Sequence, residues 1–209
     1  MFGVTDLGVF IVAGLILNIT PGVDLLYITN RSAVQGKKAG VVAALGIGAG
    51  CMVHVFAAAF GLSVILLSSA VIFSIIKYLG AAYLIYLGVN TFLSLNKKNS
   101  QRSRSSTVLP LTKIFSQAVL INALNPKVAL FFIALLPQFV APDAGNPSLA
   151  FFFLGLVFNV NGTLVNILFA VFTSFLAVKL KASTAFSRFL KSLSGILFIG
   201  LGIRLAVTS

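Results

Sequence analysis

The sequence predicts an all-α membrane protein with six transmembrane helices. Hydrophobic residues make up 59 % of the chain and charged residues only 9 %, whereas a soluble domain has about 25 % charged residues. Six apolar stretches are each long enough to cross about 30 Å of hydrocarbon as a helix. Because these stretches fill the chain, we expect one polytopic domain over residues 1–209, and neither a soluble nor a disordered protein. The stretches run from about 7–28, 39–67, 70–93, 114–140, 149–178 and 184–207.

Charged residues lie mostly in the loops and indicate the topology. The loops after the first, third and fifth stretches hold most of the 15 Lys and Arg, whereas the loops at 68–69 and 141–148 hold none. Under the positive-inside rule, the basic loops lie in the cytoplasm and both termini lie outside. The N-terminus lacks the positive charge of a cleaved signal peptide, so we expect the first stretch to be retained. A nucleic-acid-binding protein would instead gather its basic residues on a soluble face.

A segment rich in Ser, Lys and Arg at 96–112 predicts a flexible cytoplasmic linker and divides the domain into two sets of three stretches. Pro21 and Pro126 interrupt the first stretch of each set. Two three-helix units in series have opposite orientations, which is the inverted-repeat plan of many secondary transporters. We therefore expect repeat 1 over about 1–95 and repeat 2 over about 113–209. The alternative is a chance likeness between apolar segments.

The first and fourth helices are predicted to be broken at these prolines. Thr20-Pro21 and Asn125-Pro126 each have the pattern of an N-cap followed by proline at the first helical position. Each span would then consist of two half-helices, the second starting near mid-membrane, where its free N–H groups favour an anion. A plain proline kink is the alternative, since membrane helices tolerate proline.

Two charged residues lie inside these broken spans. Asp24, three residues after Pro21, is the only acid within a span, and burying a carboxylate in a membrane costs at least about 2.5 kcal/mol. Lys127 directly follows Pro126, where its charge opposes the dipole of the half-helix. We interpret Asp24 as a cation partner or proton carrier and Lys127 as a partner for an anion. The alternatives are a structural salt bridge, dipole stabilisation by Asp24, or a Lys127 side chain that extends to the cytoplasmic side.

A zwitterion fits this charge inventory, with its ammonium on Asp24 and its carboxylate on Lys127 and the half-helix N-termini. The sequence has no Glu and one Cys, so carboxylate-rich divalent-cation sites and cysteine-pair redox chemistry are unsupported, and we expect no metal and no cofactor. The candidate residues for substrate binding or proton coupling lie at the two breaks. They are Asp24, Lys127, Asn18, Thr20, Pro21, Gly22, Asn122, Asn125 and Pro126.

Polar residues in the second and fifth stretches are weaker candidates. His54 has the pKa range of a proton shuttle, although a lone membrane histidine is more often a hydrogen-bonded packing residue. Asn159, Thr163 and Asn166 share one helical face and either line a polar path with His54 or join helices by hydrogen bonds. The glycines at 46, 48 and 50 predict close helix packing.

Several motifs in order resemble the LysE/RhtB amino-acid exporter family. They are NITPGVD at 18–24, QGKKAG at 35–40, KYLGAAYLIYLG at 77–88, NALNPK at 122–127 and LPQF at 136–139. The family's usual Pro-Gly-Pro-Asp is PGVD at 21–24 here. The resemblance implies proton-driven efflux of an amino acid across a bacterial inner membrane.

We therefore expect a secondary active exporter rather than an enzyme, with protons and a small amino acid as partners and lipid around it. A single membrane acid favours a neutral substrate such as threonine or homoserine, because a basic amino acid would need a second acid. A carrier of another small solute or ion, or a non-transporting membrane subunit, are the alternatives. A homodimer is compatible with the sequence, but no residue pattern requires it.

Overall fold

The computed structural model describes residues 2–64, 108–141 and 143–176, together with isolated helical positions within 71–93 and 192–207. The predicted third and sixth spans and most of the linker lie outside these residues, so the six-span inverted repeat stays a prediction. Within the described residues, the structure is helical apart from loops and one isolated antiparallel bridge, which agrees with the predicted all-α class. The helical elements are α1 (Leu7–Ile19), α2 (Val23–Ala57), the π-helix η1 (Ala58–Leu62), α5 (Leu111–Ala123), α6 (Pro126–Leu135), the 3₁₀-helix η2 (Leu136–Phe139) and α7 (Pro147–Leu176).

Two of these segments are long and apolar enough to cross a membrane, namely α2 with η1 over Val23–Leu62 and α7 over Pro147–Phe175. A third span is formed if α5 and the α6–η2 segment are taken together, since they are bent by 44° at their junction. Helix α1 is apolar but has only 13 residues, which is too short to cross about 30 Å alone. A helix break is therefore present between α5 and α6 at Pro126, the position where the sequence predicts one.

Helix α2 doubles back at Gly36. Gly36 has φ 79° and ψ −179°, a conformation that residues with a Cβ rarely adopt. A Cβ built on Gly40 would lie 2.7 Å from the Ser32 Cβ, so the segments before and after Gly36 pack against each other. Gly36 therefore divides α2 into two segments at a position that lies between the expected stretches at 7–28 and 39–67.

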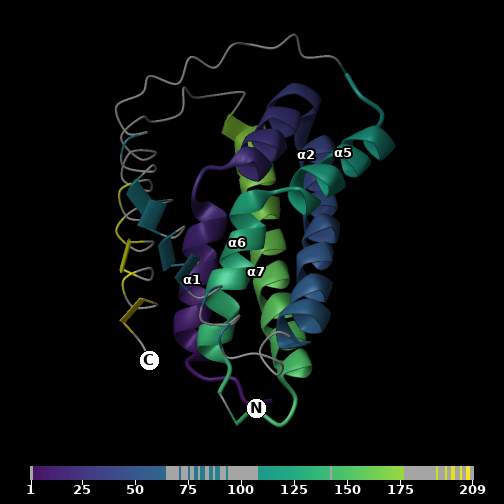
Figure 1. Ribbon diagram of the computed structural model, residues 1–209. Coiled ribbons are helices and arrows are strands. Elements are labelled where there is room, and N and C mark those ends of the chain that lie inside the picture. The colour runs from purple at the N-terminus through teal and green to yellow at the C-terminus, as the bar shows by residue number, and fades with distance from the viewer. Residues whose placement is uncertain are drawn as a thin grey trace.

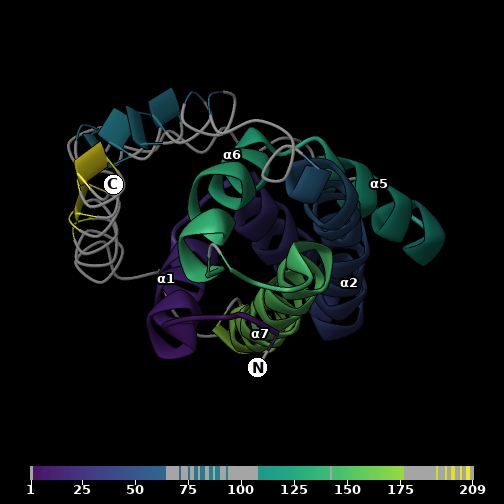
Figure 2. The same ribbon diagram turned by 60° about the horizontal axis from the view of Figure 1, so that its bottom comes forward.

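Close packing around α2 depends on its glycines, as their spacing predicts. A Cβ on Gly46 would lie 2.6 Å from the Ala118 Cβ, and one on Gly50 would lie 2.5 Å from the Val119 carbonyl oxygen, both on α5. A Cβ on Gly48 would lie 2.5 Å from the Thr163 Oγ1 on α7. In both ribbon views, α7 lies between α1 and α2 (Figures 1 and 2). The glycines let α5 and α7 approach α2 from two sides.

The two ends of the bundle differ in charge within the described residues. At one end, Thr5 N–H donates to the Phe139 carbonyl and Ala141 N–H donates to the Gly3 carbonyl, so the N-terminal segment lies beside the loop before α7 (Figure 1). At the other end, the Gln35 amide exchanges two hydrogen bonds with the backbone of Leu109. The described basic loop residues belong to that second end. They are Arg31, Lys37, Lys38 and Lys113.

Candidate functional site

The chain breaks between α1 and α2 because Pro21 cannot continue the helix. Thr20 is extended, with φ −63° and ψ 120°, as a residue before proline prefers. Gly22 is also extended, and α2 begins only at Val23 with Gly22 as its N-cap. The prediction that Thr20 caps this half-helix with Pro21 as its first residue is therefore wrong. Thr20 instead ends α1, and its hydroxyl donates to the Ile16 carbonyl at 2.6 Å.

The break between α5 and α6 has the predicted N-cap. Asn125 precedes Pro126, which is the first residue of α6, and the Asn125 Oδ1 accepts a hydrogen bond from the Lys127 N–H at 3.0 Å. The difference from the first break is one residue. Gly22 stands between Pro21 and the helix in the first break, whereas Pro126 begins its helix directly.

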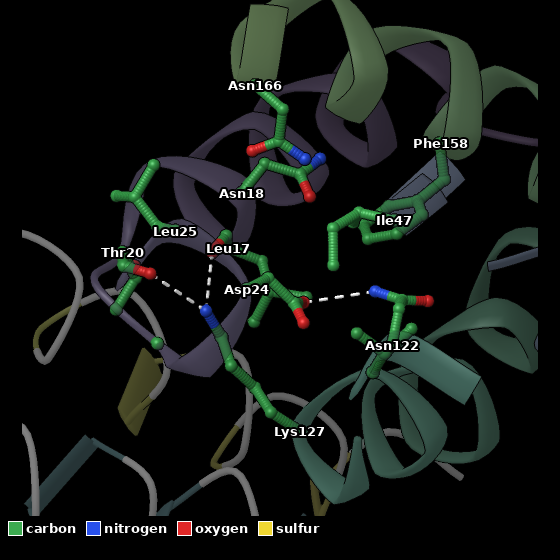
Figure 3. Close-up of a pocket in the computed structure, with 12 residues that line it drawn as sticks. Leu17, Asn18, Thr20, Asp24, Leu25, Ile47, Asn122, Lys127, Phe158 and Asn166 are labelled. Carbon is green, nitrogen blue, oxygen red and sulfur yellow. Dashed lines mark hydrogen bonds between the residues drawn. The ribbon is translucent and has the colours of Figure 1, made fainter. Parts of the chain in front are cut away.

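The Lys127 side chain caps the C-terminus of α1. Its Nζ donates to the Leu17 carbonyl at 2.8 Å and to the Thr20 carbonyl at 2.9 Å (Figure 3). In an unbroken helix the Leu17 carbonyl would accept from residue 21, which is proline and has no N–H. The cation also lies at the negative end of the α1 dipole. The positive charge of Lys127, which is unfavourable at the N-terminus of α6, is thus favourable at the C-terminus of α1.

The Asp24 carboxylate is held by amides from the other break. Its Oδ2 accepts from the Asn122 Nδ2 at 3.0 Å and from the Asn125 Nδ2 at 2.8 Å. Its Oδ1 is buried and has no hydrogen-bond partner among the residues that the structure describes. Hydrogen bonds therefore join the two breaks in both directions. Lys127 of the α5–α6 break donates to the backbone of the α1–α2 break, and the Asn122 and Asn125 amides donate to Asp24.

His54 joins the second break from α2. Its Nε2 lies 2.8 Å from the Asn122 carbonyl oxygen, and because a carbonyl only accepts, Nε2 is the protonated nitrogen. The Asn122 carbonyl loses its usual helical partner to Pro126 and accepts instead from the Asn125 N–H at 2.9 Å and from His54. His54 is thus a buried side chain that is hydrogen-bonded at the second break.

A pocket lies where the two breaks meet (Figure 3). Its cavity volume is about 30 Å³, which is enough for a water molecule but smaller than an amino acid in this conformation. Asp24 and Lys127 line it together, and the Asn18 Nδ2 is a second buried polar atom there without a partner. The pocket is lined by Leu17, Asn18, Thr20, Gly22, Asp24, Leu25, Ile47, Asn122, Lys127, Val128, Phe158 and Asn166.

The predicted polar face of α7 is divided between two roles. Asn166 lines the pocket, whereas the Asn159 Nδ2 donates to the Met52 sulfur on α2 at 3.2 Å. Thr163 donates to Asn159 at 3.5 Å and lies against Gly48. Asn159 and Thr163 thus join α7 to α2, and of the three only Asn166 lines this pocket.

The sequence interpretation missed the apolar wall of the pocket. Leu17, Leu25, Ile47, Val128 and Phe158 supply it from four helices. No motif marks these residues among so many apolar ones. Phe158 is fixed there by Phe131 and Phe132, whose ring centroids lie 5.1 Å and 5.2 Å away. Within the described segments, no group of three His, Cys, Asp or Glu side chains that would hold a metal is present.

We expect His54→Phe to destabilise the protein by about 0.5–1.5 kcal/mol, because it removes one of the two donors to the buried Asn122 carbonyl, the other being the Asn125 N–H. The ring shape is kept, and His54 already packs 6.0 Å from the Phe132 ring. His54→Gln retains an N–H donor and should lose less. Melting temperatures of the purified variants in detergent measure this order, and equal losses would show that the hydrogen bond contributes nothing.

The fold and pocket define a helical membrane protein with a charged pocket between broken helices, as expected of a small-solute carrier. The chain belongs to the LysE type translocator family, which matches it over residues 15–209, so the resemblance in its motifs is confirmed. Leucine efflux protein of Salmonella choleraesuis (strain SC-B67) is 29 % identical, with 98 % of this chain and 96 % of that protein aligned. The uncharacterized membrane protein YrhP of Bacillus subtilis (strain 168) is 32 % identical over 89 % of this chain and 91 % of that protein. No solved structure matches the chain.

Proposed function

We propose that the protein is a secondary active exporter of neutral amino acids that exchanges its substrate for protons. The observation on which this depends most is the buried Asp24 Oδ1, which lacks a partner in a pocket that also contains Lys127. A buried charge with unused hydrogen-bonding capacity in a membrane protein indicates a ligand or a proton. Family membership and the leucine efflux relatives support amino-acid export.

The substrate ammonium would bind to Asp24, and the substrate carboxylate to Lys127 and the Asn18 amide. Asp24 offers an unused acceptor and Asn18 an unused donor, which are the groups that a zwitterion requires. Exchange with protons follows if Asp24 holds either the substrate ammonium or a proton, but not both. Each turnover then takes substrate out and brings a proton in.

The pocket favours an aliphatic side chain. Asp24 is its single acid, so a basic amino acid would find no second partner. Apart from Asp24 and Lys127, half of the lining residues are Leu, Ile, Val or Phe, and the Salmonella relative is named a leucine efflux protein. We therefore place leucine before threonine and homoserine, the substrates that the charge inventory alone favoured.

For the membrane arrangement we keep the prediction of an inner-membrane protein with both termini on the periplasmic side. The N-terminal segment and the loop before α7 lie at one end of the bundle, as that topology requires of them. Arg31, Lys37, Lys38 and Lys113 belong to the opposite end, which would face the cytoplasm. Dimerisation remains compatible with this arrangement.

The direct test uses purified protein in liposomes with an imposed pH gradient. Vesicles that are acidic inside should accumulate labelled leucine, because outward protons drive inward substrate in an exchanger. Threonine, homoserine, lysine and cysteine are screened beside leucine, and protein-free liposomes are the control. Accumulation that ignores the pH gradient would rule out proton exchange. No uptake of any amino acid by folded protein would favour another solute or a non-transporting subunit.

We expect Ile47→Ala to lower leucine transport about 10-fold relative to threonine, because a lost apolar contact in a substrate pocket costs about 1–3 kcal/mol. Ile47 is 4 % exposed and lines the pocket. Leu45→Ala is the matched control, since Leu45 lies on the same helix with 47 % of its surface exposed. The leucine-to-threonine ratio is measured because it is independent of how much protein folds, and an unchanged ratio would remove Ile47 from the side-chain subsite.

A further inference from the structure

The C-terminus of α1 presents two carbonyl oxygens to the Lys127 side chain. The Leu17 carbonyl does not receive the usual helical N–H because Pro21 has none, and the Thr20 carbonyl lies beyond the last turn of α1. Both accept hydrogen bonds from one primary ammonium, that of Lys127, at 2.8 Å and 2.9 Å. Backbone carbonyls at the negative end of a helix suit a cation, and two of them match two of the three N–H donors of an ammonium.

Space for this ammonium is provided by Gly22. A Cβ on Gly22 would lie 3.4 Å from the Lys127 Nζ and 3.5 Å from its Cδ. The end of the Lys127 side chain thus passes directly over the backbone of the first break, beside the Asp24 pocket. Asp24 Oδ1 lies in the same pocket as a buried acceptor without a partner. Two carbonyls and one carboxylate oxygen together have the chemistry of a site for R–NH₃⁺.

We propose that the Leu17 and Thr20 carbonyls form a primary-ammonium site, bordered by Asp24, that Lys127 fills in this conformation and that the substrate ammonium takes over during transport. The part of the proposal that concerns the substrate rests on the proposed amino-acid export. The ammonium site itself does not, because Lys127 occupies it in the structure.

This exchange keeps the buried charges paired at every stage. Without substrate, the pocket contains one carboxylate and one ammonium, those of Asp24 and Lys127. A zwitterion adds one charge of each sign, so its ammonium can replace Lys127 while the released Lys127 turns to its carboxylate. Leaving either charge alone would be strongly unfavourable in the membrane. Release of Lys127 also removes the hydrogen bonds that join α6 to α1, so substrate binding would free the two broken helices to move relative to each other.

Lys127→Ala empties the site and tests it by chemical rescue. We expect its melting temperature in detergent to fall by about 3–10 °C, because two buried carbonyls lose a charged donor. Millimolar methylammonium should recover about 2 °C or more of this loss. Tetramethylammonium should recover none, because it has no N–H. The native protein should not respond to methylammonium, because Lys127 already fills the site.

Two matched variants are the controls for this rescue. Lys127→Met should lose stability without rescue, because its longer side chain keeps the space filled. Lys113→Ala removes an exposed lysine of α5 and should change neither the stability nor the response to methylammonium. Failure of methylammonium to rescue Lys127→Ala, or equal rescue by tetramethylammonium or of Lys127→Met, would overturn the proposal.

A second measurement needs no emptied site, in case Lys127→Ala does not fold. In the native protein, leucine should displace Lys127 and raise the melting temperature, because its carboxylate can pair with the released Lys127, whereas N-trimethylleucine, which has no N–H, should not. Equal effects of the two compounds would contradict the exchange. If methylammonium rescues Lys127→Ala but the native protein transports no amino acid, the ammonium site is supported and the proposed export function is wrong. If the native protein transports leucine but Lys127→Ala is not rescued, the export function is supported and the ammonium site is wrong.

Discussion

Asp24→Asn should lower leucine transport by at least about 30-fold, because removing one partner of a buried charge interaction costs about 2–5 kcal/mol. The asparagine oxygen can still accept from the Asn122 and Asn125 amides, so the hydrogen bonds that hold this position are retained. The substitution therefore removes the charge and the proton-binding group while the break keeps its shape. Uptake into acid-inside proteoliposomes measures the loss.

The control for Asp24→Asn is the same substitution at Asp143, which is exposed in the loop before α7. Asp143→Asn should transport at the native rate. Both variants should also elute from size exclusion as the native protein does. Normal, gradient-dependent uptake by Asp24→Asn would remove Asp24 from both substrate binding and proton coupling.

Gly50→Ala should destabilise the protein by about 1–3 kcal/mol through overpacking. The new Cβ would lie 2.5 Å from the Val119 carbonyl oxygen and 2.9 Å from the Asn122 Cβ, so α5 must move away from α2. Because Asn122 donates to Asp24, the shift also reaches the site, and transport should fall more than the loss of folded protein explains. Thermal unfolding and transport per folded molecule measure the two effects.

Gly61→Ala is the matched control, since nothing lies within 4 Å of a Cβ built there. We expect its stability to stay within about 0.5 kcal/mol of the native value, as for most surface substitutions. A Gly50→Ala protein as stable and active as Gly61→Ala would show that the α2–α5 contact is not close in the membrane.

The positions of the helices and breaks were largely predictable because they depend on local rules. Apolar length predicts the spans, and proline predicts where a helix loses its N–H. Asn125 as the N-cap of α6 follows from the same rules. Thr20 was mispredicted because the rule for Asn125-Pro126 was applied to Thr20-Pro21, where Gly22 adds an extended residue before α2 starts.

The partners of the charged side chains were less predictable. Depth and residue type single out Asp24 and Lys127, and a salt bridge between them was one of the alternatives that the sequence left open. In the structure, Lys127 binds carbonyls at the C-terminus of α1, where Pro21 supplies no N–H donor. Asp24 binds the side-chain amides of Asn122 and Asn125 instead of Lys127. His54 could have been inferred in this way, since Pro126 frees the Asn122 carbonyl. The apolar wall around Ile47 and Phe158 depends on tertiary packing, and no local pattern reveals it.

The most direct test of the site is an equilibrium binding measurement with leucine and with 4-methylpentanoate, which is leucine without its ammonium. If Asp24 binds that ammonium, the native protein should bind leucine at least about 30-fold more tightly than 4-methylpentanoate, as expected for a buried charge pair. Asp24→Asn should lose most of this preference, whereas Asp143→Asn should keep it. An Asp24→Asn protein that prefers leucine as strongly as the native protein would show that the substrate ammonium binds elsewhere.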